Sequence, residues 1–193
     1  MRDLILKMSM SLDGFVSDLE GQNTWMFGAD EEAEAWIVDR ISNASLHIMG
    51  SRSFQDMAGW WPTSTDAFAA PMNEIPKAVF SRQGPALLDK VKTSAAPAAA
   101  SWKQAYVASR DLAEEVAKLK AEDGKPIVAH GGVRFARSLV AQGLVDQLAL
   151  LVAPVALGKG LALFSDLPAP APLQLVSSKA FPGGAVAQVY RPA

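Results

Sequence analysis

The chain has 193 residues, half of them hydrophobic and a fifth charged, with a formal net charge of −2. This length and composition predict one domain, residues 1–193, with enough apolar material for a sizeable core. The weak charge argues against nucleic acid or an anionic membrane as a partner, and the absence of cysteine with only two histidines, His47 and His130, argues against disulfides and a metal site.

The first half of the chain predicts short strands and one clear helix. Apolar side chains recur at helical spacing over residues 30–41, and acids gather in the first turn, where the helix dipole favours them. Gly50 ends one strand and Pro76 opens the next. Residues 83–101 show no clear pattern, and their low-complexity part, 94–101, predicts a loop. The strands are expected at residues 4–6, 45–50 and 75–81, the first followed by a turn at 11–14.

The second half alternates strands with helices. Asp111 with Glu114 three residues on resembles a capping box, which begins a helix that Gly124 ends. Gly183 and Gly184 form a turn between the last two strands, which predicts an antiparallel hairpin. The helices are expected at residues 111–124 and 133–142, and the strands at 105–109, 126–130, 145–154, 173–181 and 185–191. This alternation predicts an α/β sheet that is mostly parallel with an antiparallel end.

Neither the N-terminus nor the apolar runs predict a membrane segment. Asp3 and Lys7 fall inside what would be the apolar part of a signal peptide, and no cleavage pattern follows. The longest apolar stretch, residues 148–157, is interrupted by Pro154 and is too short to span a bilayer. We therefore expect a cytoplasmic protein.

Two glycines and an arginine stand where the strand at 126–130 meets the next helix. Gly131 and Gly132 leave backbone N–H groups at the helix N-terminus open to close approach, and the helix dipole favours an anion there. Arg134 in the first turn opposes that dipole, so an anion-facing role suits it better than a structural one. The segment predicts an anion site, although glycine pairs also occur in ordinary tight turns and the Rossmann spacing G-x-G-x-x-G is absent.

Residues 127–160, IVAHGGVRFARSLVAQGLVDQLALLVAPVALGKG, resemble the corresponding stretch of the dihydrofolate-reductase-like superfamily. The resemblance is strongest to the C-terminal reductase domain of the bifunctional riboflavin-biosynthesis deaminase/reductase and its small stand-alone bacterial relatives. It extends over nearly the whole chain, through the segments 8–25, 47–54, 77–82 and 173–192. It implies a three-layer α/β fold, with a mixed, mostly parallel sheet, helices on both faces and a C-terminal antiparallel hairpin, and it implies NADPH as the cofactor.

The resemblance places the cofactor at residues that follow three strands. Ser81 and Arg82 would supply a hydroxyl and a cation to the 2′-phosphate that distinguishes NADPH from NADH, unless Arg82 is merely a solvated strand-end residue. The family's usual arginine after Gly50 is Ser51 here. A cis peptide between the two glycines of the pair is also implied. The implied cofactor residues are Gly50, Arg52, Ser53, Ser81, Arg82, Gly131, Gly132, Val133 and Arg134.

Two acids compete for the role of organising protonation. Asp13 is the residue that the riboflavin-type reductases place beside the substrate, but Asp-Gly is also a common turn pair. Glu34 occupies the position that an alignment back from Gly50 gives to the acid of the folate enzymes, but it stands in an acid run, which is more typical of solvated helix surface. Asp13 is therefore the preferred candidate. Trp25 is placed beside the active-site loop, where it would contact substrate, whereas His130 is expected to satisfy its polar atoms locally as a strand-end residue.

The substrate half of the site departs from both relatives. Ile75 stands where the folate enzymes carry an arginine for the substrate carboxylate, and residues 56–68 are apolar and aromatic where the riboflavin enzymes gather acids and an arginine. A flatter, more aromatic ligand than a phosphorylated riboflavin precursor is therefore expected.

Together these features predict an NADPH-dependent reductase that transfers a hydride to a planar heterocyclic or ribosylaminopyrimidine-like small molecule. The alternatives are a nucleotide- or pteridine-binding protein without turnover, and a scaffold that keeps the glycine turns for folding alone. The resemblance also implies a homodimer. The apolar residues 148–163 would supply its interface, unless they form an interior strand.

Overall fold

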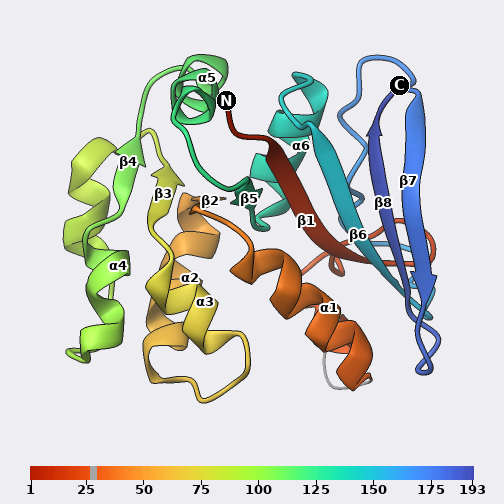
Figure 1. The fold of residues 1–193 in the computed structure, drawn as a ribbon, viewed down its shortest axis with the longest axis horizontal. Coiled ribbons are helices and arrows are strands. Elements are labelled where there is room, and N and C mark those ends of the chain that lie inside the picture. Colours follow the sequence, from red (N-terminus) through yellow and green to blue (C-terminus); the bar gives the residue numbers. More distant parts are fainter. Residues whose placement is uncertain (27–29) are drawn as a thin grey trace.

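The protein is described by a computed structural model that covers residues 1–26 and 30–193. Its centre is one eight-stranded sheet. The strands are β1 (Leu4–Ser11), β2 (Leu46–Gly50), β3 (Lys77–Phe80), β4 (Tyr106–Ala108), β5 (Ile127–Ala129), β6 (Gln147–Ala153), β7 (Leu173–Ala180) and β8 (Val186–Pro192). They lie in the order β4-β3-β2-β5-β1-β6-β8-β7, parallel from β4 to β6 and antiparallel from β6 to β7 (Figure 1). The predicted mostly parallel sheet with an antiparallel hairpin is confirmed.

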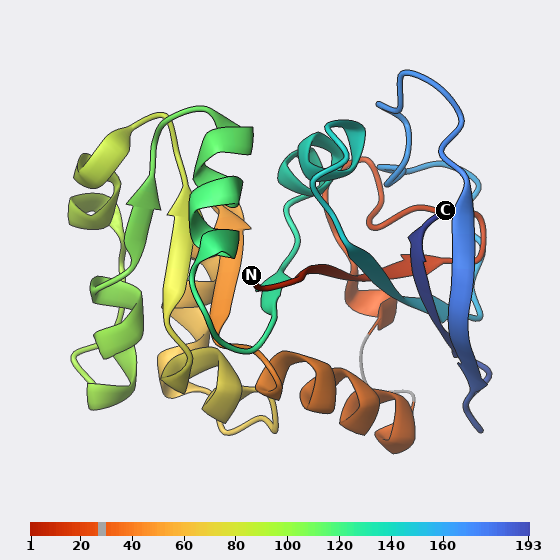
Figure 2. The same ribbon diagram turned by 45° about the horizontal axis from the view of Figure 1, so that its top comes forward.

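Helices cover both faces of this sheet. The α-helices are α1 (Glu31–Ser42), α2 (Ser51–Trp60), α3 (Ala69–Glu74), α4 (Ala100–Lys103), α5 (Leu112–Ala121) and α6 (Val133–Ala141). The short 3₁₀ helices are η1 (Thr24–Met26), η2 (Trp61–Thr63), η3 (Gly84–Lys90) and η4 (Pro97–Ala99). Helices α1 to α4 share one buried core with the sheet, and α5 and α6 share the other. In Figure 2 the orange α1 and the teal α6 accordingly lie on opposite sides of the sheet.

Strand β1 is longer than the predicted residues 4–6. Leu4, Leu6, Met8 and Met10 are all buried in the core beneath α5 and α6, while the residues between them face α1 and are less buried. This period of two continues through Lys7 and keeps residues 7–11 in the sheet. The charge of Lys7 obscured the pattern in the sequence, because an apolar run was the signal used to predict the strand.

The predicted loop at 94–101 is wrong at its end. Pro97 opens η4, and α4 follows from Ala100. The cause is Trp102, which is fully buried: its ring lies 5.5 Å from that of Phe54, and its Nε1 donates a hydrogen bond to Asn73 Oδ1 at 2.9 Å. Burying this one large side chain stabilises a helical turn that an alanine-rich sequence alone leaves undecided.

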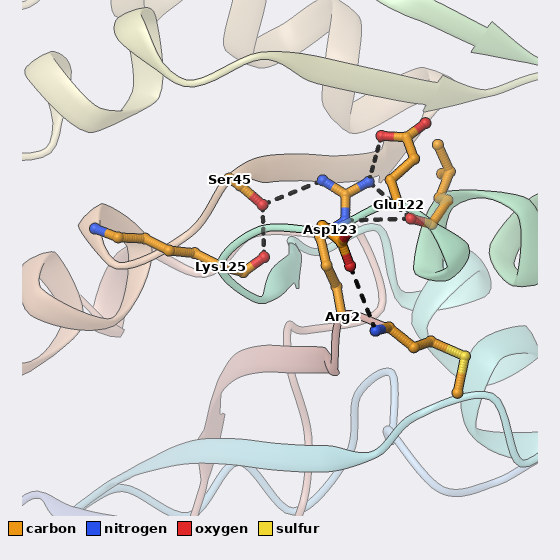
Figure 3. Close-up of polar contacts among 7 residues, drawn as sticks. Arg2, Ser45, Glu122, Asp123 and Lys125 are labelled. Carbon is orange, nitrogen blue, oxygen red and sulfur yellow. Dashed lines mark hydrogen bonds and ion pairs between the residues drawn. The ribbon is translucent and has the colours of Figure 1, made fainter.

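A polar network closes the end of the sheet at which β1 begins (Figure 3). The guanidinium of Arg2, which is buried, donates to the carbonyl of Leu119, to Ser45 Oγ and to the carboxylate of Glu122. Ser45 Oγ donates in turn to the carbonyl of Lys125. The network satisfies a carbonyl in the last turn of α5, which has no partner within its own helix. We call it the Arg2 network.

Strand β6 lies inside the sheet, between β1 and β8, and residues 148–151 are buried. Of the two alternatives for this apolar segment, β6 is therefore an interior strand. Among the described residues, no helix is both long enough and apolar enough to cross a membrane.

Candidate active site

The predicted cofactor residues gather at one edge of the sheet. Strands β3, β2 and β5 are neighbours and run in parallel, so their carboxyl ends lie side by side. Residues 81–82 follow β3, residues 50–53 follow β2, and residues 131–134 follow β5. We call this region the carboxyl edge. It is where open α/β sheets commonly bind their ligands.

Two helices begin at the carboxyl edge without a side-chain cap. Gly50 is the N-cap of α2 and Gly132 is the N-cap of α6, and neither helix has an acid in its first turn. In contrast, Asp30 caps α1 and Asp111 caps α5, each by accepting hydrogen bonds from two backbone N–H groups. The first-turn N–H groups of α2 and α6 are therefore left for an anion, which the dipoles of both helices favour.

The two helix starts pack closely because both N-caps are glycine. A Cβ atom on Gly132 would lie 2.9 Å from Ser53 Oγ, and one on Gly50 would lie 3.1 Å from Phe135 Cβ. Gly132 also has a φ of 86°, a conformation that side chains disfavour. The implied cis peptide at the glycine pair is wrong: the bond is trans, and the positive φ of Gly132 makes the turn.

Three arginines surround these helix starts. Arg52, Arg82 and Arg134 are exposed, one after each of the three strands, and within the described residues none of them forms an ion pair. Cations without a carboxylate partner beside uncapped helix N-termini make this edge electropositive, which suits a ligand with several phosphate groups. The residues present thus fit the diphosphate and 2′-phosphate of NADPH.

A cavity opens beyond β1 from this anion site, beside the first turn of α1, and we call it the α1 cavity. Its walls come from η1, α1, the end of β6 and the turn between β7 and β8. They are formed by Trp25, Met26, Asp30, Ala33, Glu34, Ile37, Leu151, Ala153, Pro154, Gly183 and Ala185. Two predicted site residues, Trp25 and Glu34, thus lie in one cavity. The indole N–H of Trp25 is buried and has no hydrogen-bond partner in the described structure.

Asp13 lies elsewhere, in the turn after β1. Its carboxylate accepts hydrogen bonds from the hydroxyl of Ser11 at 2.6 Å and from the backbone N–H groups of Leu157 and Gly158. These donors, the Ser11 hydroxyl first, lower the pKa of Asp13 to about 2. Asp13 is therefore ionised at neutral pH, an arrangement that favours anchoring of residues 157–158 over proton donation. The structure does not bring Asp13 and Glu34 into one cavity.

Sequence reasoning missed a row of basic side chains on the α1 face of the sheet. His47 of β2 pairs in register with Lys77 of β3, and the rings of His47 and His130 meet edge to face with centroids 4.5 Å apart. Burial lowers the pKa of His47 to about 4 and that of Lys7, on β1, to about 8. The expected local satisfaction of His130 is wrong, because its Nε2 is buried without a partner in the described structure. Polar residues inside otherwise apolar strands were the available signal.

The aromatic stretch at 56–68 does not reach the α1 cavity. Trp60 is 65% exposed, and the ring of Trp61 packs against Phe68 with centroids 6.1 Å apart. The described residues also contain no group of three or more His, Cys, Asp or Glu side chains that could hold a metal ion.

The chain is similar to known proteins in sequence and in fold. The chain is 29% identical over 194 residues to the uncharacterized protein YyaP of Bacillus subtilis (strain 168), covering 98% of this chain and 94% of YyaP. It shares the fold of a putative riboflavin biosynthesis protein from Shewanella sp. PV-4 (TM-score 0.73, 19% identity, 99% of each chain). It also shares the fold of the diaminohydroxyphosphoribosylaminopyrimidine deaminase/5-amino-6-(5-phosphoribosylamino)uracil reductase of Thermotoga maritima (TM-score 0.69, 15% identity, all of this chain and 57% of that one).

These structural similarities confirm the predicted fold class, with its three layers and closing hairpin. The family model of the RibD C-terminal domain matches residues 2–187, nearly the whole chain. The protein therefore belongs to the RibD C-terminal domain family.

Proposed function

We propose that the protein is an NADPH-dependent reductase that acts on a planar heterocycle. The observation that carries this proposal is the pair of uncapped helix N-termini, α2 and α6, side by side at the carboxyl edge. Their open N–H groups suit a diphosphate, and the exposed arginines around them suit further phosphate charge. Bound there, NADPH supplies a hydride from its nicotinamide.

The order of the strands supports one orientation of the bound cofactor. Ser81 and Arg82 lie on the side of the helix starts away from the α1 cavity, because β3 and β6 lie on opposite sides of β5 and β1. Arg82 would therefore bind the 2′-phosphate at the adenosine end, and the nicotinamide end would face β1 and the α1 cavity. In this cavity Glu34 would orient the heterocycle or hold its proton, and Trp25 would form a wall.

The relatives support a pyrimidine-like heterocycle. The Thermotoga protein is named for the reduction of a phosphoribosylaminouracil, and all of this chain aligns with 57% of that protein. A uracil-type ring is planar and carries N–H donors and carbonyl acceptors, which match the carboxylates and the unpaired indole N–H of the α1 cavity.

A titration of NADPH followed by tryptophan fluorescence tests cofactor binding. NADPH is expected to bind more tightly than NADH, and equal binding would remove the role given to Arg82. Oxidation of NADPH, followed by absorbance with a panel of reducible heterocycles, then separates a reductase from the alternative, a binding protein without turnover. If NADPH does not bind at all, the proposal fails.

Homodimerisation stays a prediction, and the structure directs its test to β7. All eight residues of this edge strand are exposed, and the large apolar side chains Leu173, Leu175 and Val176 are 38–53% exposed. Exposed apolar edge strands commonly pair with a second chain. Light scattering after size exclusion is expected to give a dimer that Leu175→Lys converts to a monomer. A native chain that is monomeric throughout would reject the prediction.

A further inference from the structure

The α1 cavity combines apolar walls with negative charge. Ala33, Ile37 and Leu151 form part of the apolar wall, and Asp30 and Glu34 supply carboxylates. Within the described structure, no lysine or arginine lines the cavity. The carboxyl edge on the other side of β1 has the opposite charge, since three exposed arginines lie there. The candidate substrate and cofactor sites are thus distinguished by the sign of their charge.

The charge of Asp30 is fixed by its hydrogen bonds. Its carboxylate accepts from the backbone N–H groups of Gly183, Glu32 and Ala33, which lowers the pKa of Asp30. Asp30 therefore remains ionised at neutral pH, and the hydrogen bonds hold it between α1 and the hairpin turn. The ammonium of Lys179 pairs with Glu32 at 3.2 Å and adds a smaller lowering to the pKa of Asp30, but Lys179 does not line the cavity.

One wall of the cavity belongs to Trp25, whose indole N–H is buried and has no hydrogen-bond partner in the described structure. A buried unsatisfied donor carries a free-energy cost, which a ligand carbonyl that reached this N–H would relieve. A cyclic amide ring offers both matching groups, a carbonyl for Trp25 and N–H donors for a carboxylate. A phosphate group does not match the carboxylates of the cavity, because it carries nearly two negative charges at neutral pH and its ionised oxygens have no proton to donate to them.

We propose that the α1 cavity selects a neutral or cationic cyclic-amide heterocycle that carries no phosphate group. This inference rests on the proposed function and narrows its substrate class. It separates the protein from the Thermotoga reductase, which is named for a phosphorylated substrate. The carboxylates of the cavity exclude the phosphorylated form through charge repulsion and retain the heterocycle through its N–H groups.

The test compares matched ligands that differ only in the phosphate. Calorimetry measures the binding of 5-amino-6-(ribosylamino)uracil and its 5′-phosphate, and of guanosine and its 5′-monophosphate, with and without NADPH. The unphosphorylated member of at least one pair is expected to bind about tenfold more tightly or better than its partner. Added salt should narrow this ratio, because screening weakens the repulsion.

A pair of variants assigns the selectivity to the cavity. Glu34→Gln removes one charge from the cavity and should shrink the ratio several-fold. Glu31→Gln removes the same charge from the same turn of α1, but Glu31 is exposed and does not line the cavity. The ratio of the two affinities, unphosphorylated over phosphorylated, should therefore stay at its value in the native protein. Circular dichroism verifies that both variants are folded.

Several outcomes would overturn the inference. These are tighter or equal binding of both phosphorylated members, no binding of either unphosphorylated member, or equal effects of the two variants. Failure of NADPH to bind, with the ratio intact, would instead reject the reductase and leave the selectivity of the cavity standing.

Discussion

Polar groups have hydrogen-bond partners within the chain at one end of the parallel sheet, and at the other end two helix N-termini and three arginines are left open in the described structure. At the end where β1 begins, the Arg2 network uses a buried guanidinium to satisfy a helix carbonyl, a hydroxyl and a carboxylate (Figure 3). At the carboxyl edge, α2 and α6 begin at glycines that cap nothing, and the arginines beside them have no ion-pair partner in the described structure.

This difference separates structure from function within one fold. Polar groups that the chain satisfies internally contribute to stability, because an unmet partner at such a site costs free energy. Polar groups that the chain leaves open contribute little to stability and are available to a ligand. Helix α5 makes the contrast sharper, since it also begins at the carboxyl edge and yet Asp111 caps it. An N-terminus without a side-chain cap is therefore a property of α2 and α6, and not of every helix that begins at that end of the sheet.

The largest effect is expected from Arg2→Ala. The change leaves the Leu119 carbonyl without its donor and opens a gap between the helix and the sheet, so the free energy of unfolding should fall by about 3 kcal/mol. Urea unfolding measures this loss. NADPH affinity of the folded variant should not change, because Arg2 lies at the opposite end of the sheet from the anion site. If Arg2→Ala lost most of its NADPH affinity and kept full stability, the Arg2 network would serve ligand binding and not the stability of the fold.

Gly132→Ala should mainly weaken the binding of the ligand. The added methyl meets Ser53 Oγ and strains a positive φ, which forces the two helix starts apart. We expect NADPH affinity to fall about 30-fold, which corresponds to about 2 kcal/mol. Gly143→Ala is the matched control, because Gly143 also has a positive φ but its added Cβ meets no atom within 4 Å. Gly143→Ala should lower the stability of the fold without changing the NADPH affinity. If both variants lose NADPH affinity equally, the cause is backbone strain and not damage to the anion site.

The histidines between the two ends should make the fold sensitive to acid. Burial lowers the pKa of His47 from its ordinary value of 6.5 to about 4 in the folded state, so the unfolded chain takes up the proton first as the pH falls. Stability contributed by the neutral ring is complete above pH 6.5 and is lost progressively toward pH 4. Protonated His47 would face the Lys77 ammonium and the ring of His130, with Lys7 close to that second ring. Between pH 7 and pH 5, His47 alone should lower the free energy of unfolding by about 2 kcal/mol. His130, whose pKa burial also lowers, should add to this loss.

Urea unfolding at a series of pH values measures this decrease. His47→Gln should flatten the profile while NADPH affinity at pH 7 changes little. A profile with the same slope in the variant would assign the acid sensitivity to other groups.

The sequence predicted the sheet and helices α1, α5 and α6 because their signals are local, whereas α2, α3 and α4 were not predicted in this way. The glycine pair at the carboxyl edge was also a local signal, and the other residues of that edge came from the family resemblance. Gly132 marks a helix start whichever fold contains it, and apolar period and N-caps mark α1 and α5 in the same way. The α1 cavity could not be predicted in this manner. It joins Trp25, Glu34, Leu151 and Gly183, which are far apart in the chain and meet only through the folded sheet. Asp13 shows the same limit, since its partners at 157–158 are distant in sequence.

The smallest expected effect concerns the 2′-phosphate. Arg82 is exposed at the end of β3, and its contact with a phosphate would be partly screened by solvent. Arg82→Gln should therefore weaken NADPH binding about tenfold and leave NADH binding unchanged, as measured by tryptophan fluorescence at low and high salt. Arg191→Gln is the control from the opposite end of the sheet, where Arg191 lies 3.6 Å from the carboxylate of Asp3. Because Arg191 already has a carboxylate partner, Arg191→Gln should change neither the NADPH affinity nor the NADH affinity. If both variants weaken NADPH binding equally, the preference for NADPH comes from the overall charge of the protein and not from Arg82.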